Sequence, residues 1–171
     1  MGFFPTWILL GISKLLIFTC EFRRLAPLFG ISIGVAAWLP LLTPKQECRA
    51  LQIGRLIKLA ARYTPWDSNC FPQAITARLL LELHKIPYTL CFGLMREITS
   101  KEIQAHAWVS SGRVNVTGGM SFKHFTIVGC FIGPALAQNK AWNHYSYFGA
   151  CSAKFHVAKF HYYLFWWCLQ A

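Results

Sequence analysis

A cysteine that opens an apolar helical stretch, followed by a histidine in an alternating stretch, is the feature that most constrains this chain. Cys70 comes directly after Asn69, a good N-cap residue, and precedes Pro72, which helices tolerate in their first turn. His106 follows 36 residues later, inside the strand-like run 105–109. A helix N-terminus favours the thiolate, and a neighbouring imidazole can take the thiol proton and return it to a leaving amine. The two segments predict a Cys–His nucleophilic site built from a helix and a strand.

The composition fits one domain with a substantial core and a basic surface. The 171 residues are 55% hydrophobic and only 13% charged, against roughly 25% charged in ordinary domains. The net charge of +11 suits an acidic peptide or an anionic membrane surface as a partner. No nucleic-acid-binding motif is present, so we expect no nucleic-acid partner.

The seven cysteines are scattered, odd in number and contain no CxxC pair, which argues against a zinc knuckle or a secreted disulfide scaffold. We expect most of them to be small buried hydrophobes in a reducing cytoplasm. His156 and His161 lie five residues apart, which is not a metal motif by itself, and no glycine-rich phosphate loop occurs. We expect neither a metal nor a cofactor.

Two N-terminal stretches, residues 3–20 and 25–43, approach the length of a membrane span. Lys14 interrupts the first, and prolines and glycines interrupt the second. Buried or membrane-apposed helices are therefore favoured over true spans, and membrane association stays an open alternative. A basic start and a small-residue cleavage site are both missing, which argues against a signal peptide.

Hydrophobic periodicity predicts helices followed by a sheet. We expect helices over residues 3–24, 49–62 and 70–84, and strands over residues 88–95, 104–109, 113–117 and 125–131. A Pro- and Gly-rich apolar connector joins the first two helices. A central helix that carries Cys70 and packs on an antiparallel sheet is an α+β layout.

We divide the chain into an apolar N-terminal helical region (1–48), a core (49–132) and an aromatic-rich C-terminal extension (133–171). The extension mixes aromatic and basic residues without a clean period. It is an interfacial tail, a divergent extension or the product of a shifted reading frame, and we assign it no chemistry.

The third member of the site is open, because a Cys–His pair is usually completed by an Asp or Asn that orients the imidazole. The only Asp in the chain is Asp67, and no acid follows Glu102. A two-residue hairpin loop at residues 111–112 would place Asn115 opposite Trp108 and Thr117 opposite His106, all on one face. Asn115 can act as an amide orienter and Thr117 as a hydroxyl one. Each can equally be an ordinary strand residue.

An oxyanion hole is also needed for acyl transfer. The backbone N–H of Cys70 is the natural donor, and the side chain of Gln73 is a speculative second donor.

Several segments of the chain resemble the lasso-peptide maturation proteases, the transglutaminase-like "B protein" family. The resemblance spans roughly residues 10–132. The segments are Phe22–Pro27, Ala61–Ala74, Lys85–Pro87, Phe92–Leu94, Ala105–Val109, Thr117–Gly119 and Phe125–Val128.

The resemblance implies a transglutaminase-like, papain-like cysteine peptidase core with Cys70 as nucleophile and His106 as base. Some relatives carry an Asp shortly after the His strand, where this chain has Thr117, and others share the Thr-Gly-Gly form. The implied activity is cytoplasmic removal of the leader peptide from a lasso-peptide precursor, a step in antibiotic maturation.

The family also implies partners. A small leader-recognition domain is fused or separate in this family, and nothing before the helical region resembles it, so we expect a separate protein. An ATP-dependent macrolactam synthetase, the lasso cyclase, would act next. The alternatives are a transglutaminase-like acyltransferase and a non-catalytic, membrane-associated or decayed homologue.

Overall fold

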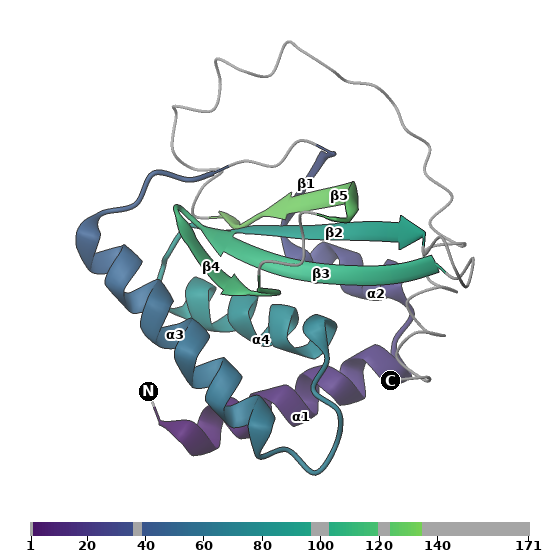
Figure 1. The fold of residues 1–171 in the computed structure, drawn as a ribbon, viewed down its shortest axis with the longest axis horizontal. Coiled ribbons are helices and arrows are strands. Elements are labelled where there is room, and N and C mark those ends of the chain that lie inside the picture. The colour runs from purple at the N-terminus through teal and green to yellow at the C-terminus, as the bar shows by residue number, and fades with distance from the viewer. Residues whose placement is uncertain (1, 36–38, 97–102, 120–123, 135–171) are drawn as a thin grey trace.

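Helices pack against one face of an antiparallel sheet in this protein (Figure 1). The computed structural model describes residues 2–35, 39–96, 103–119 and 124–134. The helices are α1 (Phe3–Thr19), α2 (Phe22–Leu25), the 3-10 helix η1 (Ala26–Phe29), α3 (Pro44–Arg62) and α4 (Cys70–Leu83). The strands are β1 (Ile31–Gly34), β2 (Thr89–Arg96), β3 (Ile103–Ser111), β4 (Val114–Thr117) and β5 (Thr126–Ile132).

The five strands form one sheet in the order β1-β5-β2-β3-β4, and every neighbouring pair is antiparallel. This confirms the predicted α+β class with a cysteine-bearing helix on an antiparallel sheet. The predicted strands match the observed ones to within two residues at each end. The aromatic-rich extension lies outside the described residues from residue 135 onward.

The N-terminal region differs from the prediction of one helix over residues 3–24. Helix α1 ends at Thr19, because Cys20 leaves the helical conformation with φ −114° and ψ 134°. The apolar connector that follows contains η1 and the edge strand β1, which sequence periodicity did not predict. Gly30, with φ +113°, provides the sharp change of direction between these two elements. No helix in the described ranges is long and apolar enough to cross a membrane.

Helix α4 forms the centre of the main core, as its almost uninterrupted apolar sequence predicts. Phe71 packs edge-on against Phe92 of β2, with ring centroids 5.5 Å apart. The polar Thr76 is also fully buried, and its hydroxyl lies 3.1 Å from the hydroxyl of Ser13 on α1. This shared hydrogen bond satisfies both buried hydroxyls, so α1 and α4 can pack without an unpaired polar atom between them.

Helix α3 begins with a capping box, in which Thr43 and Gln46 each bond the other's backbone N–H. Its Gly54 lies against β4: a Cβ at this position would be 2.7 Å from the carbonyl oxygen of Val116. The glycine therefore allows close contact between α3 and the edge of the sheet.

The hairpin between β3 and β4 has a different register from the expected one. Ser111 pairs with Val114, so the two-residue turn is Gly112-Arg113 rather than Ser111-Gly112. Gly112 has φ +56°, the positive value that a two-residue hairpin favours at its first turn position. A register shift follows between residues 109 and 110. The predicted pairings of Asn115 with Trp108 and of Thr117 with His106 are therefore wrong.

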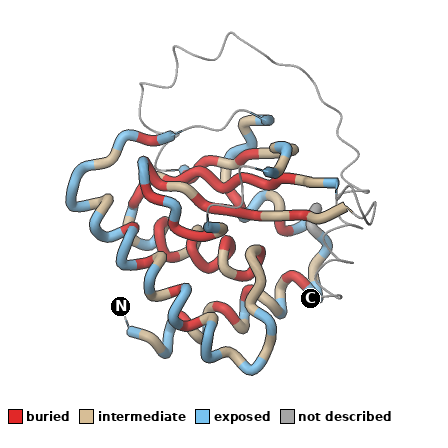
Figure 2. The backbone as a smooth tube through the Cα atoms, in the orientation of Figure 1, coloured by how far each residue is buried: buried red, intermediate tan, exposed pale blue. Residues whose placement is uncertain are grey.

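Most residues of the central strands are buried, as the red tube in Figure 2 shows. They belong to two hydrophobic clusters, one on each face of the sheet. Leu90, Phe92, Ala105, Ala107 and Val109 belong to the main core with the helices. Residues that alternate with these along the strands lie on the other face of the sheet. There Cys91, Trp108 and Cys130 form a second, smaller cluster.

Candidate active site

Cys70 is the first residue of α4, and its thiol is partly buried. The preceding Asn69 is in an extended conformation (φ −65°, ψ −177°), and its carbonyl accepts the first helical hydrogen bond from the N–H of Gln73 at 3.3 Å. Pro72 has no N–H to leave unsatisfied in this first turn. The Cys70 thiol is therefore held at the positively polarised end of a buried helix, where a thiolate is stabilised.

The loop before Cys70 is held by its own hydrogen bonds. The hydroxyl of Thr64 lies 2.9 Å from the carbonyl oxygen of Ala61 and 2.8 Å from that of Trp66, and it also contacts the Ser68 hydroxyl at 2.9 Å. The side-chain amide of Gln73 donates to the carbonyl of Ser68 at 2.6 Å. Gln73, the speculative second oxyanion donor, thus uses its amide to fix the approach to the helix.

Helix α1 also holds the loop that precedes Cys70. Lys14 donates from Nζ to the carbonyl of Asp67 at 2.7 Å, which gives this lysine in an apolar segment a structural role. The rings of Trp7 and Trp66 pack with centroids 5.0 Å apart. Gly11 makes room for Trp66, because a Cβ there would lie 3.0 Å from the indole. These contacts fix the position of the segment that leads into Cys70.

His106 lies on β3 in an aromatic setting. Its ring stacks on Trp108, with centroids 6.0 Å apart and an interplanar angle of 27°, and it lies 4.9 Å from the ring of Phe125. The residue opposite His106 on β2 is Gly93. A Cβ at Gly93 would lie 2.8 Å from Phe125 Cβ and 2.9 Å from the Trp108 ring, so only glycine fits beneath these rings.

A backbone carbonyl orients the imidazole. His106 Nε2 lies 2.9 Å from the carbonyl oxygen of Gly118, just after β4. A carbonyl can only accept, so Nε2 carries the proton and Nδ1 is the basic nitrogen of the neutral ring. Gly118 has φ +90°, and a Cβ there would collide with Trp108. Sequence reasoning missed this acceptor, because a main-chain carbonyl has no signature in the side chains.

The two predicted orienting residues lie further along the hairpin. Asn115 is exposed and pairs with Ser110, about 13 Å along β3 from His106 at the usual rise per residue. The Ser110 hydroxyl lies 3.5 Å from Asn115 Oδ1. Thr117 pairs with Val109 and is buried, and its hydroxyl has no hydrogen-bond partner within the part of the chain that the structure describes.

The elements that carry Cys70 and His106 are in direct contact. Helix α4 packs against β3, and its first turn lies under the middle of that strand (Figure 1). The structure thus places the helix and the strand that the sequence predicted side by side. Along β3, however, Ala105 and Ala107 belong to the core with the helices, whereas the His106 ring packs with Trp108 and Phe125 of the second cluster. The pairing of Cys70 with His106 stays a prediction.

A family model decides the relationship of this chain to known proteins. The model of the transglutaminase-like superfamily matches residues 16–130, which is more than half of the chain and includes both Cys70 and His106. The chain belongs to the transglutaminase-like superfamily. This superfamily is typically catalytic and includes cysteine peptidases and acyltransferases. No curated protein and no solved structure matches the chain.

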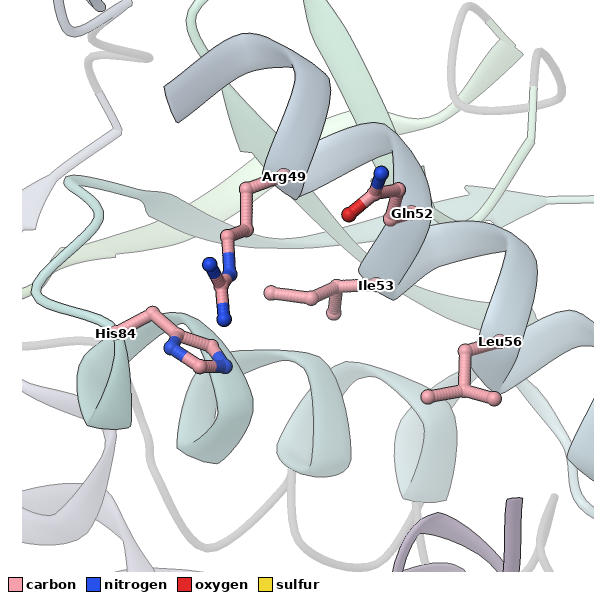
Figure 3. A pocket seen from close by; sticks show the side chains of 5 residues that line it. All are labelled: Arg49, Gln52, Ile53, Leu56 and His84. Carbon is pink, nitrogen blue, oxygen red and sulfur yellow. The ribbon is translucent and has the colours of Figure 1, made fainter. Parts of the chain in front are cut away.

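A separate pocket of this transglutaminase-like protein lies at the opposite end of α4 from Cys70. It has a volume of about 280 Å³ and is lined by Arg49, Gln52, Ile53, Leu56 and His84 (Figure 3). The Arg49 guanidinium and the His84 ring both point into it (Figure 3). Burial, and then the charge of Arg49, lower the pKa of His84. Because α4 has 14 residues, His84 at its C-terminal end lies about 20 Å from Cys70, and Cys70 does not line the pocket.

The described residues contain no candidate metal site. No three His, Cys, Asp or Glu residues of these ranges come close enough together to hold an ion.

Proposed function

We propose that this protein is a cysteine endopeptidase that removes the leader peptide from a lasso-peptide precursor. The observation that carries the proposal is a thiol at the start of α4, a helix that packs against the strand whose histidine is oriented by the Gly118 carbonyl. Membership of a superfamily that includes cysteine peptidases supports it. The lasso-peptide substrate rests on the sequence resemblance of segments such as 61–74 and 105–109.

The proposed reaction requires the His106 ring, which packs with Trp108 and Phe125 in the structure, to reach the Cys70 thiol. His106 Nδ1 then takes the proton of the thiol, and the sulfur attacks the scissile carbonyl. The imidazolium that forms keeps its Nε2–H bond to the Gly118 carbonyl, whose negative end stabilises the added charge. The N–H of Cys70 donates to the developing oxyanion. His106 then protonates the leaving amine, and water hydrolyses the thioester to release the leader as a free acid.

The partners follow from this role. The precursor's leader region binds a separate recognition protein, which delivers the scissile bond to Cys70. An ATP-dependent macrolactam synthetase then closes the ring of the released core peptide. The basic surface of the protein, with a net charge of +11, suits acidic segments in these partners.

Leader cleavage tests the proposal directly. The precursor is incubated with its recognition protein and either the wild type, the Cys70→Ala variant or the Cys48→Ala variant, and the products are weighed by mass spectrometry. Cys48 is exposed on α3 and serves as the matched control. We expect cleavage by the wild type and by Cys48→Ala, and none by Cys70→Ala. Unchanged cleavage by Cys70→Ala would overturn the assignment.

The same masses distinguish hydrolysis from acyl transfer, the second activity of this superfamily. Hydrolysis leaves a leader with a free carboxyl group, and transfer to an added amine leaves an amide adduct. We expect the acid to remain the main product when the amine is present.

Exposed apolar side chains on α1 favour membrane association as an additional property. Phe4, Ile8, Ile12 and Leu15 recur at helical spacing, and each is more than two-fifths exposed. Co-sedimentation with vesicles of an anionic phospholipid tests this. Binding that is equal for the wild type and for an Ile8→Ser, Leu15→Ser double variant would argue against it.

A further inference from the structure

The second cluster of the sheet contains two cysteines that the proposed reaction does not use. Cys91 on β2 and Cys130 on β5 are directly opposite each other in the antiparallel ladder. Both are buried, with exposed fractions of 2% and 0%, and neither forms a disulfide in this structure. Their sulfur atoms lie 2.6 Å apart.

This pair meets the geometric conditions for a cross-link. Facing residues of an antiparallel pair have Cα atoms roughly 4.5–5.5 Å apart, which lies within the range that disulfides span. The sulfurs need to approach by only about 0.6 Å to reach the usual bond length of about 2.04 Å. The backbone would therefore not have to move far for the bond to form.

We propose that Cys91 and Cys130 are an oxidation site, which forms an intramolecular disulfide between β2 and β5 when the protein meets a hydroperoxide. With hydrogen peroxide, one thiol loses its proton and the thiolate attacks one peroxide oxygen. The O–O bond breaks, the sulfur becomes a sulfenic acid, and the leaving hydroxide takes up the thiol proton and departs as water. The second thiol displaces the sulfenic hydroxyl as a second water, and the S–S bond forms. The two cysteines together lose two electrons and two hydrogens, and the peroxide is reduced.

The surroundings of the pair explain why it stays reduced until it is challenged. Hydrogen bonding to Cys130, followed by burial, raises the pKa of the Cys91 thiol, so little thiolate is present at neutral pH. Access comes from the edge of the sheet, because Cys130 pairs on its other side with Gly34 of the short edge strand β1. Opening of a short edge strand takes less free energy than global unfolding. The oxidation is therefore expected to be slow and to accelerate with pH.

The cross-link would also stabilise the part of the sheet on which the His106 ring packs. Cys91 pairs with Cys130 on one side and with Trp108 on the other, and Trp108 stacks on His106. Closing a loop of 39 residues should raise the melting temperature by roughly 10 °C.

Peptide mapping of the full chain tests the proposal. Reduced protein is treated with hydrogen peroxide, denatured, blocked with N-ethylmaleimide and digested without reductant. We expect one cross-linked peptide pair that contains Cys91 and Cys130, two fewer alkylated thiols and recovery of both thiols with dithiothreitol. Separate labels on Cys91 and Cys130, or bonds of either one to other cysteines, would overturn it.

Variants separate this pair from the other thiols. Cys48→Ala removes an exposed cysteine and should leave the cross-link intact, whereas Cys91→Ala should abolish it. The rise in melting temperature on oxidation should disappear with Cys91→Ala alone. If Cys91→Ala does not fold, the map of the wild-type protein still decides the proposal.

Discussion

His106 donates a hydrogen bond from Nε2 to the backbone carbonyl of Gly118 at 2.9 Å. A main-chain acceptor does for this imidazole what an Asp or Asn side chain does in most Cys–His sites. The lack of an acid after Glu102 therefore does not deprive the ring of an orienting partner. It also means that the identities of the side chains at 115 and 117 should matter little for the reactivity of Cys70.

Replacement of Thr117 tests that consequence. Thr117→Val keeps the shape of the side chain and removes a buried hydroxyl that has no partner in the described ranges. We expect the free energy of unfolding to rise by about 1 kcal/mol, because an unsatisfied polar atom is removed. The rate at which iodoacetamide alkylates Cys70 should stay within about twofold of the wild type, since Gly118 still holds the imidazole. A tenfold loss of that rate would instead identify Thr117 as the orienting group.

Replacement of Gly118 should have the opposite result. Gly118→Ala forces a side chain into a left-handed conformation (φ +90°) and against Trp108, which displaces the carbonyl that His106 bonds. We expect a loss of stability of about 2 kcal/mol and a fall on the order of tenfold in Cys70 alkylation at pH 7.

Gly119→Ala is the matched control for Gly118→Ala. Gly119 also has a positive φ of +60°, but a Cβ there would meet nothing within 4 Å. This variant should share the backbone strain and keep the Cys70 reactivity. Equal loss of reactivity in the two variants would show that strain in the loop, rather than the Gly118 carbonyl, governs the site.

The contact beneath the imidazole predicts a further sensitivity. Gly93→Ala places a methyl group 2.8 Å from Phe125 Cβ and 2.9 Å from the Trp108 ring, so these rings must shift. We expect a loss of about 2 kcal/mol in unfolding free energy, as for other overpacked sites, and displaced ring signals of His106 in NMR spectra. Gly129→Ala on β5, where a Cβ meets nothing within 4 Å, should leave both quantities unchanged. Similar losses in the two variants would contradict the packing argument.

The sequence predicted the parts of this fold whose signals are local. Alternation identified β2 to β5 to within two residues, and the N-cap and apolar pattern placed Cys70 at the first residue of α4. Strand β1 was not predicted, because it has only four residues and depends on pairing with β5, about 100 residues away. The hairpin register was wrong because one shifted residue after the Gly112 turn changes every later pair.

The site shows the same limit. The helix end and the strand could be predicted from side chains, but the acceptor of His106 is a main-chain oxygen, and the partner of Cys91 lies 39 residues away. The roles of Cys70 and His106 in catalysis remain predictions for the alanine variants to test.

Tyr88 predicts how stability responds to alkaline pH. Its buried hydroxyl accepts from Arg78 Nε at 3.1 Å and lies 3.5 Å from the carbonyl of Phe29. Burial raises the pKa of Tyr88 above its ordinary value near 10, although the nearby Arg78 charge opposes this. The unfolded chain therefore loses this proton first, so the stability that Tyr88 contributes is full below pH 10 and is lost as the pH rises further.

Tyr88→Phe should accordingly be less stable than the wild type by about 1 kcal/mol at pH 7, because it lacks these hydrogen bonds. The difference should shrink between pH 9 and about 11, since phenylalanine has no proton to lose. Urea unfolding at pH 7, 9 and about 10.5 measures it, with Tyr63→Phe as the control, because Tyr63 is 67% exposed. A difference that stays constant or grows with pH would show that ionisation of Tyr88 does not cause the loss of stability at alkaline pH.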